Sequence, residues 1–393
     1  MKAVVCGAGI AGLALAHRLD ALGWEVVVVE RAPGPRTQGY MVDFFGPGYD
    51  AAEAMGLLPR LEELAYRIDE AGFVDERGHR RAGLDYTRFA RALDGRMLSI
   101  MRPDLERALR EALPAAVDLR FETGPTAVRD TADGVRVTLL DGTVETADLL
   151  VGADGVHSTV RRLVLGEEAS FLRYMGFHTA AYVFDDPQIF AQVRDRFCMT
   201  DTVDRQMGLY GLRDGRVAAF GVHRAESGAL PPDVREAVRR AYGGLGWVVP
   251  RALGACPPSG EVYYDQVAQI VMDRWSSGRT ALVGDAAHAV SLLAGQGASL
   301  GIAGAYVLAE ELGRSASVDA GLAAYEARWR PVVEDRQEAG RAAAEWFLPA
   351  SASRLRLRRA AMRLSGFPGV GRLVARSLSG KPAVLAREAA RSA

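Results

Sequence analysis

The sequence contains little lysine, little cysteine and almost no net charge. Only two of its 48 basic residues are lysines, Lys2 and Lys381, a bias more typical of genome composition than of a mechanism. The net charge of −1 argues against a general nucleic-acid-binding protein. Cys6, Cys198 and Cys256 are too few and too widely spaced for a disulfide framework or a zinc site. We therefore expect no metal site and a reducing, cytoplasmic setting.

Long apolar runs are also missing. The most apolar region, residues 281–309, is interrupted by Asp285, His288, Gln296 and several glycines, so it lacks the about 18 uninterrupted apolar residues that a membrane helix needs. We therefore expect no membrane span. The 393 residues suffice for two domains, and a composition of 49% hydrophobic and 25% charged residues is typical of a globular protein.

Charge is unevenly distributed along the chain. Residues 350–393 contain ten basic residues and one acidic residue, Glu388, so this segment carries a charge of +9 and the remainder about −10. Such a tail could bind an acidic membrane or a partner. We expect instead that residues 346–393 form basic helices that fold against the acidic body of the same chain, interrupted at Gly366-Phe367-Pro368-Gly369.

The first motif is VVCGAGIAGLALA, residues 4–16. A strand, a glycine turn and a helix in this order are typical of a pyrophosphate-binding site. Gly7 permits the tight turn, Gly9 lets phosphate approach the backbone, and Gly12 lets the helix pack closely on the sheet. The free N–H groups at the start of the helix then favour an anion.

The same segment has a second interpretation, a secretory signal peptide with Lys2 as its charge and Ala14-Leu15-Ala16 as its cleavage site. The residues that follow favour the first interpretation, a pyrophosphate-binding turn. Val26–Val29 are typical of a buried parallel strand. Glu30 lies roughly 20 residues beyond the glycines, where a carboxylate meets a ribose hydroxyl. The motif thus predicts a dinucleotide, without separating FAD from NAD(P).

Two further segments contain an apolar strand that ends at a carboxylate. DLLVGADGVHSTVR, residues 148–161, runs into a Gly-Ala-Asp-Gly turn and a helix that Ser158 could cap. GRTALVGDAAH, residues 278–288, ends its strand at Asp285, which is suited to bind a sugar or ribityl hydroxyl. For His288, which directly follows this strand, we expect a structural role.

In this order, GAGIAG, VGADGVHSTVR and GDAAHAVSLLAGQG resemble the class A flavoprotein monooxygenases, over a stretch from Met1 to about Gln337. The resemblance implies an α/β fold with a Rossmann-type, GR2-like FAD-binding domain interleaved with a β-sheet substrate domain. The expected divisions are 1–70, 97–170 and 275–345 for the FAD-binding domain, 71–96 and 171–274 for the substrate-binding sheet domain, and 346–393 for the basic C-terminal helices.

The resemblance also implies which residues bind FAD. Gly7, Gly9 and Gly12 would hold the pyrophosphate, and Glu30 the adenosine ribose. The other residues expected at the FAD site are Arg31, Arg102, Asp154, Gly155, Asp285, Gly295, Gln296 and Gly297. A helix expected over 297–313 would direct its N-terminal amides at the flavin N1 and C2 carbonyl, where reduced flavin carries negative charge.

The hairpin RQMGLYGLRDGRVAAFGVHR, residues 205–224, is the candidate substrate site. We expect Asp214-Gly215 to form a two-residue turn, which pairs Gln206 with His223 and places both on one face with Tyr210. Two glycines beside them leave room for a pocket with these three polar anchors, although a solvated face is the alternative. His223 could polarise or deprotonate a phenolic substrate.

The function implied by the resemblance is an FAD-dependent monooxygenase that consumes O2 and NADPH or NADH. It would hydroxylate an aromatic or polyketide-like small molecule through a flavin C4a-hydroperoxide. The same motifs suit a Baeyer–Villiger monooxygenase, a flavin reductase, an oxidase or a non-catalytic flavin-binding protein. An NAD-dependent dehydrogenase would use the first motif alone. The substrate, the position oxidised and the oligomeric state stay open.

Overall fold

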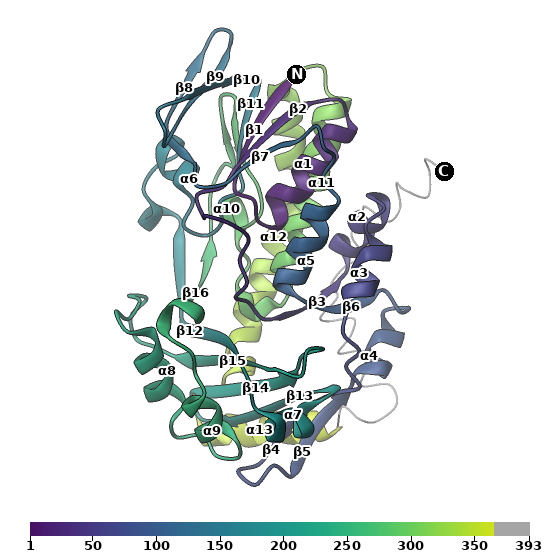
Figure 1. Ribbon diagram of the computed structural model, residues 1–393, viewed down its shortest axis with the longest axis vertical. Helices are drawn as coiled ribbons and strands as arrows, with labels where there is room; N and C mark the ends of the chain where they lie inside the picture. Colours follow the sequence, from purple (N-terminus) through teal and green to yellow (C-terminus); the bar gives the residue numbers. More distant parts are fainter. Residues whose placement is uncertain (365–393) are drawn as a thin grey trace.

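The computed structural model describes residues 1–364, and its two largest sheets lie in the upper and lower halves of Figure 1. The upper sheet has six strands in the order β17-β18-β11-β1-β2-β7. Its strands are β1 (Lys2–Cys6), β2 (Glu25–Val29), β7 (Asp118–Arg120), β11 (Leu149–Gly152), β17 (Ser276–Ser277) and β18 (Thr280–Leu282). All pairs are parallel except β17 with β18.

The buried valines of β2 show why this sheet forms. All four, Val26–Val29, are buried, because helices and a small second sheet cover the six strands. The strands contact α1 (Ile10–Ala21), β9 (Gly134–Leu139) and β10 (Val144–Ala147). Helices α5 (Arg102–Glu111) and α11 (Gly297–Arg314) pack on α1, and β8 (Pro125–Thr131) pairs with β9. The strand, turn and helix predicted for residues 4–16 are present as β1 and α1, and the Rossmann-type α/β fold is confirmed.

The lower sheet has seven strands in the order β16-β12-β15-β14-β13-β4-β5. Its strands are β4 (Glu70–Val74), β5 (Arg80–Asp85), β12 (Leu172–Phe184), β13 (Arg196–Thr202), β14 (Arg205–Gly211), β15 (Val217–Arg224) and β16 (Tyr263–Ile270). An apolar cluster joins one face to α7 (Pro187–Val193), α8 (Val234–Tyr242) and α9 (Val249–Gly254). The other face lines a cavity described below.

Strands β14 and β15 form the predicted hairpin, but its turn is longer than predicted. The Leu212 N–H donates to the Arg216 carbonyl at 2.8 Å, which leaves three residues in the loop. Gly215 takes the left-handed conformation, with φ of +86°. This geometry is typical of a type I turn followed by a bulge, so the expected two-residue turn is wrong.

The extra loop residue shifts the strand pairing by one position. Gln206 lies opposite Val222, and His223 lies opposite Arg205. Because neighbours along a strand point to opposite faces, Gln206 and His223 do not share a face, and the predicted grouping of the two is wrong. His223 packs instead against α8, with its Nδ1 3.1 Å from the Tyr242 hydroxyl, and burial lowers its pKa to about 4.

Shorter elements and two C-terminal helices complete the described chain. The shorter elements are β3 (Met41–Phe45), β6 (Met97–Met101), α2 (Pro47–Ala54), α3 (Leu58–Leu64), α4 (Tyr86–Ala92), α6 (Thr159–Val164) and α10 (Asp285–His288). Helix α12 (Val318–Phe347) packs on α11, and α13 (Ala352–Leu364) packs on β5. The break expected at 366–369 lies outside the described residues. No helix within residues 1–364 is long and apolar enough to cross a membrane.

Candidate cofactor and substrate site

Two cavities adjoin at the start of α1. The sheet cavity, of about 330 Å³, is bounded by the seven-stranded sheet, and the turn cavity, of about 430 Å³, follows the glycine turn between β1 and α1. Both are lined by Gly9, Arg102, Ala153 and Gly155, so they meet at these residues. The Arg102 guanidinium, 3.4 Å from the Glu106 carboxylate, supplies positive charge at this junction.

Two of the three glycines of the turn, Gly7 and Gly12, are required by close backbone contacts. A Cβ at Gly12 would lie 1.9 Å from the Gly7 carbonyl oxygen, and a Cβ at Gly7 would lie 2.5 Å from the Ala153 carbonyl oxygen. A Cβ at Gly9 would meet no atom of residues 1–364 within 4 Å. No side chain in this described range caps α1 at Gly9, so its first N–H groups can receive an anion.

Glu30 and Arg31 line the turn cavity at the end of β2. The Glu30 carboxylate accepts hydrogen bonds from the Ala8 N–H at 2.9 Å and the Ala32 N–H at 2.8 Å. These two bonds fix the carboxylate beside the glycine turn. The Arg31 side chain is exposed.

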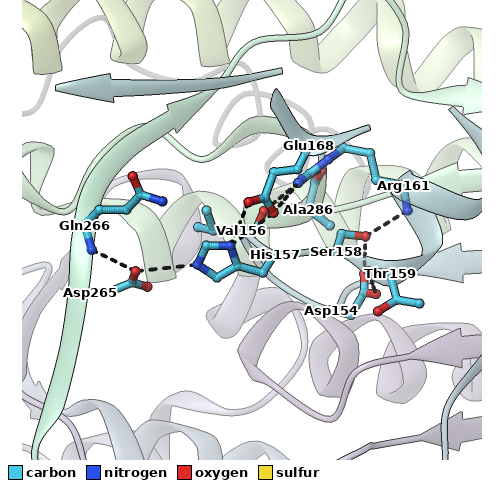
Figure 2. A network of polar contacts seen from close by, with 10 residues as sticks. All are labelled: Asp154, Val156, His157, Ser158, Thr159, Arg161, Glu168, Asp265, Gln266 and Ala286. Atoms are coloured by element: carbon cyan, nitrogen blue, oxygen red, sulfur yellow. Dashed lines mark hydrogen bonds and ion pairs between the residues drawn. The ribbon is translucent and has the colours of Figure 1, made fainter. Parts of the chain in front are cut away.

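Asp154 stabilises the turn that precedes α6. Its carboxylate accepts hydrogen bonds from the Ser158 hydroxyl and from two backbone N–H groups at the start of the helix, as Figure 2 shows in part. Ser158 in turn accepts from the Arg161 N–H at 3.0 Å, so the predicted helix cap is confirmed. Burial raises the pKa of Asp154. Gly155, with φ of +79°, follows it and lines both cavities.

Sequence reasoning missed the role of His157 in this turn. Its Nδ1 lies 3.0 Å from a Glu168 carboxylate oxygen, and its Nε2 lies 3.5 Å from the Asp265 carboxylate (Figure 2). Hydrogen bonding to Asp265, and then to Glu168, raises the pKa of His157 to about 9. His157 lines the turn cavity and Asp265 the sheet cavity, so the pair spans the region between them. The only signal in the sequence was the position of His157 within the second motif, residues 148–161.

The third motif forms one side of the sheet cavity. Asp285 lines this cavity at the start of α10, and enclosure of its carboxyl group within the protein raises the pKa of Asp285. Gly295 and Gly297 line it at the start of α11, which matches the helix predicted over 297–313. The Gln296 side chain is buried and is not among the lining residues. His288 is also buried, lines neither cavity, and has its pKa lowered to about 4 by burial.

Strand β14 supplies the opposite wall of the sheet cavity, with Gln206 and Tyr210 as its polar residues. The Tyr210 hydroxyl oxygen accepts a hydrogen bond from the Met41 N–H at 2.6 Å. At Gly208 a Cβ would lie 2.3 Å from the Phe197 ring, so the missing side chain makes room for this ring rather than for a ligand. Other lining side chains are largely apolar or aromatic, namely Met199, Phe220, Tyr263, Leu293 and Phe347.

Asp43 is a further polar residue that sequence reasoning missed. Its carboxylate lines the sheet cavity and accepts hydrogen bonds from the Tyr86 hydroxyl and, at 2.8 Å, from the Ser99 hydroxyl. Enclosure within the protein raises its pKa. These three residues come from β3, α4 and β6, and no local sequence pattern connects them.

Residues 1–339 match the family model described as FAD binding domain. The chain belongs to this family. The flavoprotein is 36% identical to an uncharacterized protein of Mycobacterium tuberculosis over 344 residues, which cover 85% of this chain and 91% of that protein. It is 31% identical to the FAD-dependent monooxygenase asL6 of Sarocladium schorii, with 86% of each chain covered. The crystal structure of tetracycline destructase Tet(51) has a TM-score of 0.80 and 25% identity, covering 97% of this chain and 99% of that one.

These similarities confirm the resemblance found in the motifs: the flavoprotein is an FAD-dependent monooxygenase of class A. The cavities fit its cofactor. The uncapped start of α1 suits a pyrophosphate, and the open position of Gly9 lets that group approach the backbone. The adjoining sheet cavity provides the apolar and aromatic surface that a flavin ring and a small molecule need.

Proposed function

We propose that this FAD monooxygenase uses NADPH or NADH and O2 to hydroxylate an aromatic or polyketide-like small molecule. The junction of the two cavities carries the proposal, because a cofactor with its pyrophosphate at Gly9 reaches directly into an aromatic-lined space. Bound FAD supplies the redox chemistry: two electrons from the nicotinamide allow O2 to give one oxygen atom to the substrate and the other to water. The similarity to a tetracycline destructase supports a polycyclic or aromatic substrate.

The backbone of Gly7, Gly9 and Gly12 would hold the FAD pyrophosphate, and the fixed carboxylate of Glu30 would bind the adenosine ribose. Gln296 would contribute through its backbone, since its side chain is buried. The other proposed contacts are Arg31, Arg102, Asp154, Gly155, Asp285, Gly295 and Gly297.

Three of the polar residues that line the sheet cavity would orient the substrate among its apolar and aromatic side chains: Gln206, Tyr210 and Asp43. Because the Tyr210 oxygen is held by the Met41 N–H, its own proton can be donated to a substrate oxygen. The apolar lining excludes water, which protects the oxygen-transfer step from hydrolytic loss. Baeyer–Villiger, reductase and oxidase reactions would use the same residues, and the mass of the product separates them.

The test is an anaerobic titration of the purified protein with NADPH, and then NADH, followed by the visible absorbance of the flavin. Bleaching supports the proposed electron donor, and bleaching that requires an added aromatic compound supports substrate-controlled reduction. Addition of ¹⁸O2 should then place one ¹⁸O atom in the product. An FAD-loaded protein that neither nucleotide reduces, with or without an aromatic compound, would overturn the proposal.

A further inference from the structure

Two arginines of helix α13 contact strand β13. This strand pairs with β14, which carries Gln206 in the wall of the sheet cavity. Asp201 lies on β13, directly opposite Gln206 on β14. Its carboxylate forms ion pairs with Arg358 and Arg359, both on α13. Asp201 and Arg358 are only 6% and 3% exposed, so this pair is buried. Both arginines lie beyond residues 1–339, which match the family model.

Arg358 also contacts the cavity wall itself. Its Nη1 lies 3.4 Å from the Gln206 Oε1 and 2.5 Å from the Phe347 carbonyl oxygen, and its guanidinium lies 4.6 Å from the centre of the Phe73 ring. Asp201, Phe347 and Phe73 thus hold the guanidinium from three sides. Its position relative to Gln206 is therefore fixed by the fold.

A guanidinium can only donate hydrogen bonds, whereas a glutamine amide has one accepting end and one donating end. The Gln206 oxygen must therefore face Arg358, and the NH2 group takes the other position. No protein group within residues 1–364 accepts a hydrogen bond from this NH2 group. Since Gln206 lines the sheet cavity, its donors are available there.

We propose that Arg358 is a positioning residue that holds the Gln206 amide as a hydrogen-bond donor toward the sheet cavity, and so selects substrates with a carbonyl oxygen at this wall. The proposal rests on the proposed function of that cavity. Arg358 does not line the cavity, and Asp201 pairs with its charge. The group that faces the cavity is therefore a neutral hydrogen-bond donor rather than a cation. A neutral donor binds a carbonyl oxygen better than it binds a carboxylate.

The test uses the FAD-loaded full-length protein and two probes, 4-hydroxyacetophenone and 4-ethylphenol, which differ by a carbonyl oxygen in place of two hydrogens. Binding is followed by the perturbation of the flavin absorbance. The wild-type protein should bind 4-hydroxyacetophenone about threefold to tenfold more tightly, the contribution of one neutral hydrogen bond. In Arg358→Met the amide can rotate by half a turn, and this preference should disappear.

Arg359→Met is the matched control, because it removes the other partner of Asp201 without a contact to Gln206. It should keep the carbonyl preference. Gln206→Glu keeps the contact with Arg358 but presents an oxygen to the cavity, so it should reverse the preference even if Arg358→Met does not fold.

If Arg358→Met and Arg359→Met lose the carbonyl preference equally, Arg358 acts only by holding α13 against β13, and the proposal is overturned. Equal affinity of the wild-type protein for the two probes, or binding of neither probe, would also overturn it. Failure of the proposed function has a different signature, since NADPH and NADH would then leave the FAD-loaded protein oxidised. A protein that is reduced but shows no carbonyl preference contradicts only the present inference.

Discussion

The imidazole Nε2 of His157 lies 3.5 Å from the carboxylate of Asp265, although the two residues come from distant parts of the chain. His157 precedes α6 at the edge of the turn cavity, and Asp265 lies on β16 in the seven-stranded sheet. Glu168 contacts the other ring nitrogen, so a charged imidazole has a carboxylate on each side. This contact connects the segment before α6 to the seven-stranded sheet that bounds the sheet cavity.

This arrangement predicts a pH-dependent contribution to stability. The folded protein raises the pKa of His157 from 6.5 to about 9, so the protonated form is favoured by folding. The stabilisation is fully present below pH 6.5 and is lost as the pH rises through 9. In urea unfolding at several pH values, His157→Gln should be less stable than wild type at pH 6, with the difference shrinking toward pH 10. His79→Gln, at an exposed turn, is the control. A difference that does not change with pH would contradict this prediction.

Substitutions in the glycine turn should separate folding from cofactor binding. Gly9→Ala introduces a Cβ that meets no described atom within 4 Å, so the apoprotein should unfold at nearly the wild-type temperature but bind FAD more weakly. Gly12→Ala places a Cβ 1.9 Å from the Gly7 carbonyl oxygen and should lower both the unfolding temperature and the FAD content. Thermal unfolding of apoprotein and the flavin absorbance of purified protein measure the two effects. If Gly9→Ala retains wild-type FAD affinity, the pyrophosphate lies elsewhere.

Asp201→Asn should strongly destabilise the protein. It leaves the buried guanidinium of Arg358 without its carboxylate partner, and breaking a buried ion pair typically costs about 3–5 kcal/mol. Urea unfolding gives the change in the free energy of unfolding. Asp214→Asn removes an exposed partner of Arg216 and should cost no more than about 1 kcal/mol. A similar decrease in the free energy of unfolding of the two variants would show that burial does not make the Asp201 pair more important for stability than the exposed Asp214 pair.

Residues on the two faces of the β14–β15 hairpin should differ in their effect on activity. Gln206→Leu removes a polar group from the sheet cavity and should lower kcat/KM by about threefold to tenfold, the value of one hydrogen bond. His223→Gln lies on the opposite face and can keep its hydrogen bond to Tyr242, so kcat/KM should not change. Steady-state NADPH oxidation with an identified substrate measures both. A decrease in kcat/KM in His223→Gln alone would contradict this prediction and support His223 as a substrate-binding residue.

The Rossmann-type sheet and its glycine turn could be predicted because their signals are local in sequence. Gly7, Gly9 and Gly12 lie close together in sequence at a spacing typical of a dinucleotide-binding turn, and the run of valines in β2 is typical of a strand buried on both faces. The face of His223 could not be predicted in the same way. An Asp-Gly pair suits both two-residue and three-residue loops, and one residue of difference exchanges the two faces of a strand.

The remaining polar contacts depend on tertiary structure. Asp43 meets Tyr86 and Ser99 only because β3, α4 and β6 pack together. The contact between Arg358 and Gln206 joins residues 152 positions apart. The basic charge of the C-terminal segment predicted that its helices would dock on the acidic body of the chain, but not that Arg358 and Arg359 would pair with the buried carboxylate of Asp201.

The placement of Phe347 and Arg358 has a consequence for biosynthesis. Every residue that lines the turn cavity has been synthesised once Leu163 is added, whereas Phe347 and Arg358 are synthesised well after all of them. The sheet cavity is thus completed later in translation than the turn cavity. In terms of the proposed function, a chain that ends before Phe347 retains all of the turn-cavity lining but has an open sheet cavity, where oxidation of NADPH by O2 would yield hydrogen peroxide in place of hydroxylated product.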